Sequence, residues 1–273
     1  MNKEKFIDIR RLIKSKNPKL LKWLPGFMVN YLRRILHEDD INKFIDRNGH
    51  LYDDVFCEAI IDYFNIKIVM EGLENLPPEG PAIVAMNHPL GGMDAIAFVV
   101  GIKEKRKDVQ FIVNDLLMNL ENLKNLFVGV NKHGKNGASV RQQIRNIFDS
   151  DKLVCIFPAG MVSRKIEGNV TDLLWKKTFV QYGREFNRPV VPVYIDGELT
   201  NFFYRLSKFR KFIGIKTNIE MLYLADELFK QKNRTITFTI GKPIYGAEIN
   251  PELSDADASE WFRNHVHQFR KSK

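Results

Sequence analysis

The sequence predicts an α/β fold in which a mostly parallel or mixed sheet is flanked by helices and is preceded by a basic helical segment. Apolar runs of strand length recur along the chain, and the segments between them are long enough for helices. One of these runs, residues 82–86, is apolar throughout, which is typical of a strand buried on both faces of a parallel sheet.

Length and composition limit the number of domains. With 273 residues, 44% of them hydrophobic, the chain can bury one large core or two modest ones. We interpret it as a basic amphipathic helical segment at residues 1–50 followed by a single globular domain at residues 51–273.

The N-terminal segment has the pattern of short basic amphipathic helices. Through residue 36 it carries ten Lys and Arg against two acidic residues, with apolar residues between them. Pro18 and Pro25 divide it, because proline removes a backbone donor and disfavours helix in the residue before it. Such helices either pack on a protein core or lie on an anionic membrane, and the pattern is compatible with both.

The elements of the globular domain follow from periodicity and from turn residues. Ile66, Ile68 and Met70 alternate, as in a half-buried strand. Ser254, with Asp257 three residues later, approximates a capping box and predicts the start of a final helix. Further strands are expected at 82–86, 109–113, 126–130, 153–157, 190–195 and 234–240, and further helices at 39–47, 53–64, 95–104, 138–149 and 171–186.

Charge and cysteine content narrow the cellular setting. The formal net charge of +9 predicts attraction to phosphate on nucleic acid, on anionic lipid or on a phosphopantetheine carrier. No run of about 18 apolar residues and no signal-peptide pattern is present, so we expect a cytoplasmic protein. Cys57 and Cys155 lie far apart in apolar surroundings, which predicts neither a disulfide nor a zinc site.

Residues 86–94 contain the first candidate for chemistry. His88 and Asp94 follow the buried strand at 82–86, and in an α/β sheet reactive groups gather at the carboxyl ends of strands. The two residues would be about 240° apart on a continuous helix, so the chain must loop back through Pro89, Gly91 and Gly92 to join them. A histidine held by an aspartate can act as a general base near neutral pH. An ordinary strand-to-helix connection, with Asp94 as a helix cap, is the competing interpretation.

Residues 154–164 form a second loop of the same kind. A buried strand ends at Phe157, a Pro158-Ala159-Gly160 turn follows, and Ser163 and Arg164 lie just beyond it. Backbone amides of such a turn can face an oxyanion or a phosphate, and arginine grips phosphate through its planar fork. A base from one loop and anion donors from another form the pairing that acyl transfer requires.

Two later segments are compatible with either a structural or a binding role. Residues 172–179 predict a helix whose Trp175 lies in the core, with Lys176 and Lys177 either solvated or in contact with substrate. Residues 201–216 interleave aromatic with basic side chains and contain no acid. That composition suits a lipid headgroup interface or an amphipathic helix with a buried aromatic face. It matches no nucleic-acid recognition module, so no nucleic-acid partner is expected.

Taken together, these loops resemble the motifs of the glycerolipid acyltransferases, the family of lysophosphatidic-acid acyltransferase. Asn87-His88 followed by Asp94 resembles the family's His-x4-Asp motif, and residues 157–160 with Ser163 resemble its Phe-Pro-Glu-Gly-x-x-Ser motif. Residues 127–132 resemble the intervening block, which places Lys132 at the position that binds the acceptor's phosphate. Residues 191–193 resemble the fourth block, so the resemblance covers about residues 66–197 in the family order.

Two departures from the family pattern concern the acceptor more than the reaction. Five residues instead of four separate His88 from Asp94, and Ala159 stands where the family has glutamate. The combination resembles a bacterial branch of hemolysin-like proteins and acyltransferases of amino-acid lipids. An extra glycine can lengthen a loop without moving its ends, whereas loss of a carboxylate changes what the acceptor pocket recognises.

The resemblance implies a glycerol-3-phosphate acyltransferase-like fold and transfer of a fatty acyl group from an acyl thioester. The donor would be acyl carrier protein or coenzyme A, and no resident cofactor is implied. His88 and Asp94 would be catalytic, and the substrate-binding residues would be Asn87, Lys132, Phe157, Pro158, Gly160, Ser163 and Arg164. The expected acceptor is a lysophospholipid or glycerol phosphate, on the inner face of the cytoplasmic membrane with its anionic surface as a partner.

Three alternatives differ in class. The first is an N-acyltransferase that makes glycine or ornithine lipids, which the Ala159 departure favours. The second is a catalytically silent membrane-binding relative, against which the intact His88 and Asp94 pair counts. The third is a metal-dependent hydrolase, which is not expected because the other five histidines show no ligand spacing on one element.

Overall fold

The computed structural model describes residues 5–114, 120–130 and 137–271. The chain forms two compact units. Unit 1 consists of Met1–Leu51 with Thr200–Lys232, and unit 2 consists of Tyr52–Leu199 with Asn233–Lys273. The predicted division at residues 50 and 51 separates the N-terminal segment at nearly the same place, but it leaves residues 200–232 with the larger part.

Unit 1 is helical. Pro18 opens the second helix and Pro25 directly precedes the third, so the predicted breaks at the two prolines are confirmed. His37 joins the two chain segments of the unit, because its ring stacks on Phe229 at 3.7 Å and its Nε2 lies 3.1 Å from Asp226 Oδ1. The elements are α1 (Ile9–Lys16), α2 (Pro18–Trp23), α3 (Gly26–Ile35), α4 (Glu38–Asn48), α9 (Asn201–Phe212), the 3₁₀ turn η4 (Ile219–Tyr223) and α10 (Leu224–Phe229).

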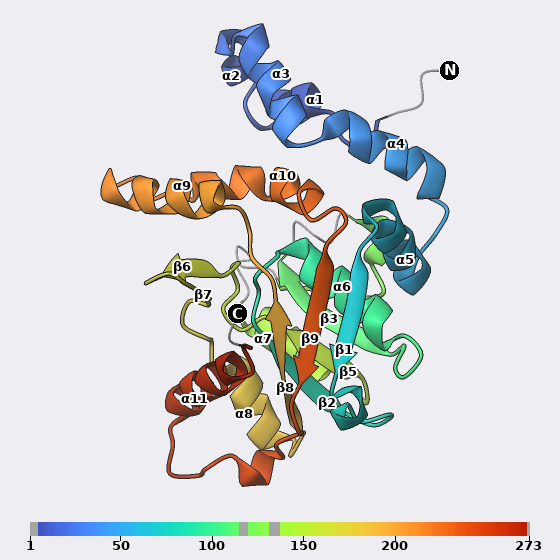
Figure 1. Cartoon of the computed structure of the whole chain (residues 1–273), viewed down its shortest axis with the longest axis vertical. Helices are drawn as coiled ribbons and strands as arrows, with labels where there is room; N and C mark the ends of the chain where they lie inside the picture. Colours follow the sequence, from blue (N-terminus) through green and yellow to red (C-terminus); the bar gives the residue numbers. More distant parts are fainter. Residues whose placement is uncertain (1–4, 115–119, 131–136, 272–273) are drawn as a thin grey trace. The chain divides into compact units, whose positions relative to one another are not determined.

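Unit 2 is built on a seven-stranded mixed sheet of order β1-β9-β8-β2-β5-β3-β4 (Figure 1). Neighbouring strands are parallel except β8 and β9, which are antiparallel, so a mostly parallel or mixed sheet is confirmed. A separate two-stranded hairpin joins β6 to β7. The strands are β1 (Lys67–Glu71), β2 (Ala82–Met86), β3 (Val109–Asn114), β4 (Phe127–Val130), β5 (Leu153–Ile156), β6 (Arg164–Ile166), β7 (Asn169–Thr171), β8 (Val190–Asp196) and β9 (Thr235–Ile240).

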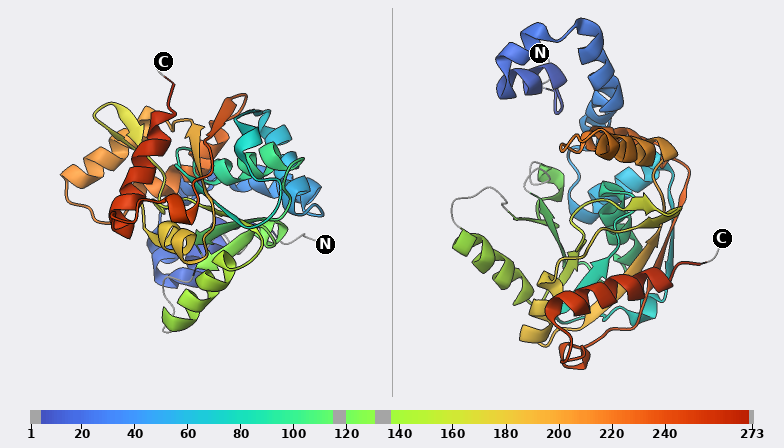
Figure 2. Two further views of the ribbon diagram at one scale, coloured as in Figure 1. Left: turned by 90° about the horizontal axis from the view of Figure 1, so that it is seen from below. Right: turned by 90° about the vertical axis from the view of Figure 1, so that its left-hand side faces the viewer.

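Helices lie on both faces of this sheet (Figure 1 and Figure 2). Ile83 and Ala85 of β2 belong to a core cluster that includes Phe148, Phe179 and Phe262 from three helices. The elements beside the strands are α5 (Asp53–Phe64), η1 (Leu73–Asn75), α6 (Gly92–Ile102), η3 (Glu121–Leu123), α7 (Gly137–Phe148), α8 (Thr178–Glu185), η5 (Gly246–Glu248) and α11 (Asp255–Gln268). Strand β2 is completely buried, as its uninterrupted apolar run predicted.

Most of the predicted elements lie within a few residues of the observed ones. Ser254 caps α11 by accepting a hydrogen bond from Asp257 N–H, as predicted. The helix predicted at 171–186 is wrong in its first part, since residues 169–171 form β7 and the helix begins only at Thr178. The side chains of Asp172 and Trp175, which lie between β7 and this helix, are both buried.

The sheet topology fixes the position of the reactive loops. Strands β2, β5 and β8 are mutually parallel, so their carboxyl ends meet at one edge of the sheet. The segments after Met86, Ile156 and Asp196 therefore leave the sheet side by side. Within the described residues, no helix combines the length and the hydropathy needed to cross a membrane.

Candidate active site

The loop after β2 folds back and brings His88 to Asp94. Gly91 has φ 71° and ψ −135°, a conformation that only glycine adopts without strain, and α6 begins at the next residue. Asp94 in the first turn of α6 then lies with Oδ2 2.9 Å from His88 Nδ1, and the same oxygen accepts a hydrogen bond from Leu90 N–H at 2.9 Å. The predicted proximity of the two side chains is therefore present, while their catalytic role is a proposal.

The pairing sets the tautomer of His88. A carboxylate oxygen can only accept, so His88 Nδ1 carries the hydrogen and Nε2 keeps its lone pair. The His88 side chain is 18% exposed, whereas that of Asp94 is fully buried. A partly exposed imidazole whose Nε2 keeps its lone pair is the arrangement expected of a general base.

Asp94 is not fully neutralised by its surroundings. Its second oxygen, Oδ1, is buried and has no hydrogen-bond partner among the described residues. Burial raises the pKa of Asp94 above its ordinary value, and the hydrogen bond and charge of His88 oppose this effect. A positive charge on His88 is thus the partner that the buried carboxylate lacks when the imidazole is neutral.

The second loop supplies the surface against which the imidazole lies. The ring of Phe157 stacks on that of His88 with a centroid separation of 4.0 Å and an angle of 21°. Phe157 in turn stacks on Phe111 of β3 at 5.8 Å. Gly160, at φ +64°, closes the turn by donating its N–H to Phe157 O at 2.9 Å. The hydrogen bond to Asp94, the stacked ring of Phe157 and the turn at Gly160 thus hold the His88 imidazole at the carboxyl edge of the sheet.

The remaining predicted site residues are placed differently. Asn87 is buried and bonds the backbone of Ile195 with both ends of its amide, which ties β2 to β8. Arg164 is also buried and donates to Val162 O at 2.6 Å. Pro158 is buried as well, and its carbonyl accepts a hydrogen bond from Lys176 N–H at 3.0 Å. Lys132 lies outside the described residues. Substrate contact by these residues stays a prediction.

Sequence reasoning missed Asp172, which joins the two loops. Its carboxylate is fully buried and accepts from Ser163 Oγ at 2.5 Å and Trp175 Nε1 at 2.8 Å, and its Oδ1 lies 3.3 Å from His88 N. Its position at the head of a Leu-Leu-Trp run resembled the start of a helix. The available signal was an acidic residue next to a tryptophan predicted to be buried, because a buried indole N–H needs an acceptor.

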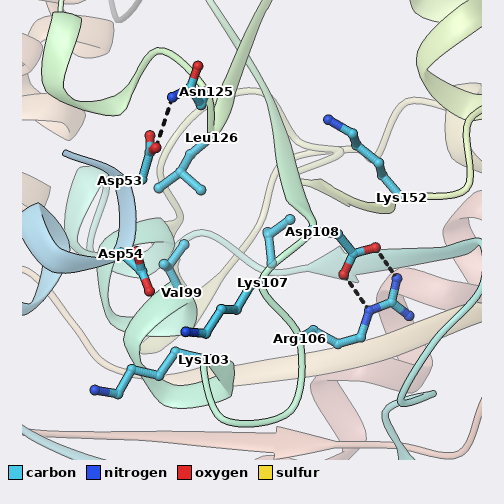
Figure 3. Close-up of a pocket in the computed structure, with 11 residues that line it drawn as sticks. Asp53, Asp54, Val99, Lys103, Arg106, Lys107, Asp108, Asn125, Leu126 and Lys152 are labelled. Atoms are coloured by element: carbon cyan, nitrogen blue, oxygen red, sulfur yellow. Dashed lines mark hydrogen bonds and ion pairs between the residues drawn. The ribbon is translucent and has the colours of Figure 1, made fainter.

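A polar hollow of about 230 Å³ lies at the other edge of the sheet (Figure 3). Val109 and Lys152, at the amino ends of β3 and β5, help to line it. Arg106 and Asp108 in its wall form an ion pair with two hydrogen bonds. Among the described residues that line this hollow there is no histidine and no cysteine. The chemistry points to the His88 edge instead.

The described residues contain no group of three or more His, Cys, Asp or Glu side chains placed to hold a metal ion. Both cysteines are buried, and burial raises the pKa of Cys57 and of Cys155 above the ordinary thiol value. A buried, protonated thiol is a poor nucleophile. The candidate for the reactive side chain is His88, which is paired with the buried Asp94.

The fold and the site together are an α/β sheet that carries, at its carboxyl edge, a histidine bonded to a buried aspartate beside a glycine-containing turn. A protein-family model described as an acyltransferase matches residues 11–273. The chain belongs to this acyltransferase family, and the resemblance drawn from the four blocks is confirmed. The chain is accordingly an enzyme, an acyltransferase.

Two curated relatives match almost the whole chain. A lyso-glycine lipid O-acyltransferase of Bacteroides thetaiotaomicron is 40% identical over 265 residues, which cover 96% of this chain and 97% of the relative. A lyso-glycine lipid O-acyltransferase of Phocaeicola vulgatus is 39% identical over 265 residues, covering 96% of this chain and 95% of the relative. Among solved structures, the 1-acyl-sn-glycerophosphate acyltransferase PlsC of Thermotoga maritima is 19% identical, with a TM-score of 0.49 and coverage of 90% of this chain and 95% of that one.

Proposed function

We propose that the protein transfers a fatty acyl group from an acyl thioester to the hydroxyl of a lyso-amino-acid lipid, with a lyso-glycine lipid as the first candidate. The observation that carries this proposal is the buried Asp94 bonded to His88 Nδ1, which leaves the lone pair of Nε2 available on a partly exposed imidazole. The curated relatives support the acceptor, since both are lyso-glycine lipid O-acyltransferases and match this chain nearly end to end.

In the proposed reaction His88 acts as the general base. Nε2 takes the proton of the acceptor hydroxyl while its oxygen attacks the thioester carbonyl carbon. The tetrahedral intermediate then collapses with cleavage of the carbon–sulfur bond, and the leaving thiolate receives the proton from the His88 imidazolium. Asp94 stabilises that imidazolium, and the proton released by one substrate is returned to the other. No covalent acyl-enzyme and no resident cofactor enter this sequence.

The turn at residues 158–162 is the proposed oxyanion site. Gly160 N–H is already used within the turn, so the donors would be the neighbouring backbone amides. Preorganised amides of this kind stabilise the charge that develops in the transition state more than the neutral carbonyl. Phe157 would orient the acyl group beside His88, because its ring already covers one face of the imidazole.

Unit 1 would bring the enzyme to its lipid substrate on the inner face of the cytoplasmic membrane. It contains 19 Lys and Arg against 9 Asp and Glu, a formal net charge of +10, whereas unit 2 has 23 against 24, a net charge of −1. Exposed aromatic side chains accompany this charge, among them Trp23, Phe27, Phe209 and Phe212. Basic residues interleaved with exposed aromatic ones suit an anionic lipid surface. The anionic thioester donors, acyl carrier protein or coenzyme A, would be attracted by the same charge.

The second candidate acceptors are lysophosphatidic acid or glycerol 3-phosphate, and a free amino group for N-acylation. The four sequence blocks favour a phosphate-bearing acceptor, while Ala159 in place of glutamate favours an amino-acid lipid. His88 would act as the base with each of these acceptors, so its geometry does not discriminate between them. The acceptor is identified from the lipid products.

The test is a product assay with purified protein. Acyl carrier protein and coenzyme A thioesters are offered with lyso-glycine lipid, lysophosphatidic acid, glycerol 3-phosphate, glycine and ornithine, and lipids are identified by mass spectrometry. We expect O-acylation of the lyso-glycine lipid, and a loss of at least about 10²-fold in His88→Ala. His265→Ala is the matched control, because the ring of His265 contacts Trp261 and Phe269. Full activity in His88→Ala would exclude the mechanism. Phosphatidic acid as the sole product would show that the acceptor is lysophosphatidic acid and not a lyso-glycine lipid.

A further inference from the structure

Asp172 and Ser163 together hold both polar atoms of the His88 peptide backbone. The N–H of His88 lies 3.3 Å from Asp172 Oδ1, and the C=O of His88 accepts a hydrogen bond from Ser163 N–H at 2.8 Å. Ser163 Oγ donates to the same Asp172 oxygen. The main chain of the base is therefore clamped by the second loop, independently of the bond from Asp94 to its ring.

Only a carboxylate satisfies all three donors that converge on residue 172. Oδ1 accepts from His88 N–H and Ser163 Oγ, and Oδ2 accepts from Trp175 Nε1–H. An asparagine could accept at one end, but its amide nitrogen would then face the indole N–H, donor against donor. A buried donor without an acceptor is costly, which explains why an acid stands at this position.

Side chains of the C-terminal helix α11 hold the backbone of Asp172 in place. Asp172 N–H lies 3.4 Å from His267 Nε2, and Arg263 Nη1 donates to Asp172 O at 3.2 Å. Burial lowers the pKa of His267, while the negative charge of Asp172 opposes this effect. A neutral His267 can accept the Asp172 N–H. The carboxylate thus sits between a helix that anchors it and two loops that it joins.

We propose that Asp172 is a positioning residue of the active site, which sets where the His88 imidazole stands relative to the turn at residues 158–162. It acts through His88 and Ser163 and touches no reacting atom. This inference rests on the proposed function, because the position of His88 matters only if His88 is the base. A displacement of about 1 Å in such a group can cost on the order of 10² in rate.

The experiment compares carboxylate-to-amide changes at the two edges of the sheet. Asp172→Asn is the test variant, and Asp108→Asn is its matched control, since Asp108 bonds the buried Arg106 at the opposite edge. We expect Asp172→Asn to lower kcat by about 10²-fold while KM for the thioester changes less than about threefold. Asp108→Asn is expected to lower the melting temperature with little change in kcat of the folded protein. Equal losses of kcat in the two variants would overturn the proposal.

Ser163→Ala keeps the proposal testable if Asp172→Asn does not fold. It removes one hydroxyl, and we expect kcat to fall by about tenfold at unchanged KM. Where Asp172→Asn does fold, the loss in the double variant should equal that of Asp172→Asn alone, because residues that act as one unit are not additive. Unchanged kcat in Ser163→Ala, or strict additivity, would contradict a shared role.

Hydrogen exchange separates this inference from the proposed reaction. The amide of His88 should exchange slowly in the wild type, faster in Asp172→Asn and slowly in Asp108→Asn, whatever substrate the enzyme uses. If exchange follows this pattern but His88→Ala retains activity, His88 is not the base. The hydrogen bonds of Asp172 and Ser163 to the His88 backbone would then have only a structural role. If the His88 amide is unaffected in Asp172→Asn, the positioning role itself is wrong.

Discussion

Glu38 in unit 1 and Asp94 in unit 2 are both buried carboxylates, and their surroundings differ. In unit 1, Glu38 is 2% exposed, and its oxygens accept from Lys5 Nζ at 2.8 Å, Arg33 Nε at 3.1 Å and Ile9 N–H at 3.0 Å. In unit 2, Asp94 is fully buried and meets one imidazole and one backbone N–H, both at the same oxygen. Glu38 is saturated with donors, and Asp94 is left incomplete.

The pKa shifts of the two groups have opposite signs for this reason. Burial alone would raise the pKa of Glu38, but the hydrogen bonds from Lys5 and Ile9 N–H and the charge of Arg33 outweigh it, so the pKa is lowered. For Asp94, burial outweighs the hydrogen bond from His88, and the pKa is raised. A carboxylate that joins helices is neutralised in the ground state. A carboxylate that assists a general base meets a positive charge only when the base takes a proton. Stabilisation at that stage favours the transition state over the ground state and therefore accelerates the reaction.

The largest effect that this comparison predicts is on catalysis. Asp94→Asn removes the charge that would stabilise the His88 imidazolium and allows the wrong tautomer, so we expect kcat to fall by about 10²–10⁴-fold. Glu38→Gln makes the same chemical change in unit 1 and is expected to leave kcat within about twofold, measured with a detergent-dispersed acceptor. Comparable losses in the two variants would remove the distinction between a structural and a catalytic carboxylate.

Stability should show the reverse order. Glu38→Gln removes the buried carboxylate that Lys5 and Arg33 share, and we expect a loss of about 2 kcal/mol in the free energy of unfolding. It should appear as faster hydrogen exchange in α1 and α3 and not in β2. Asp94→Asn removes an ionised group whose burial is unfavourable, so its denaturation midpoint at neutral pH is expected to stay equal or to rise.

The pH dependence checks the sign of the stability prediction. Because the folded pKa of Glu38 lies below its ordinary value of 4.5, its contribution to stability is complete above that value and is lost as pH falls through the folded pKa. The difference in midpoint between wild type and Glu38→Gln, followed by circular dichroism in urea, should therefore shrink below about pH 4.5. A difference that grows on acidification would contradict the lowered pKa.

Short-range patterns predicted much of the fold and the proximity of His88 to Asp94. The apolar run of β2, the glycines after His88 and the spacing to Asp94 are local features, and each determined the structure where it stands. The position of Asp172 could not be derived in this way, because its contact with His88 joins residues 84 positions apart and depends on how β6, β7 and α11 are placed. The same holds for His37, whose bond to Asp226 ties residues 200–232 to the N-terminal segment.

The smallest predicted effect extends the contrast between the units to their surfaces. Trp23 in α2 is 87% exposed and Phe212 in α9 is 88% exposed, both in the unit with a net charge of +10. If these rings enter a bilayer, Trp23→Ala or Phe212→Ala should weaken binding to phosphatidylglycerol vesicles by about tenfold, since burying a large apolar side chain contributes roughly 1.5–3 kcal/mol. Trp261→Ala is the matched control, because Trp261 is an exposed tryptophan of unit 2.

The salt dependence of vesicle binding distinguishes its electrostatic contribution from its apolar contribution. Measurement of kcat distinguishes an effect on membrane binding from an effect on catalysis. Raising the ionic strength shortens the range of the attraction between unit 1 and anionic lipid, so vesicle binding should weaken, while kcat on dispersed acceptor should not follow it. The aromatic variants should bind more weakly than wild type at every salt concentration. If Trp261→Ala weakens binding as much as Trp23→Ala, or if kcat falls in parallel with binding, then membrane attachment and catalysis do not belong to separate units. The contrast between Glu38 and Asp94 would then be a difference between two carboxylates and would not indicate that unit 1 binds the membrane while unit 2 carries out catalysis.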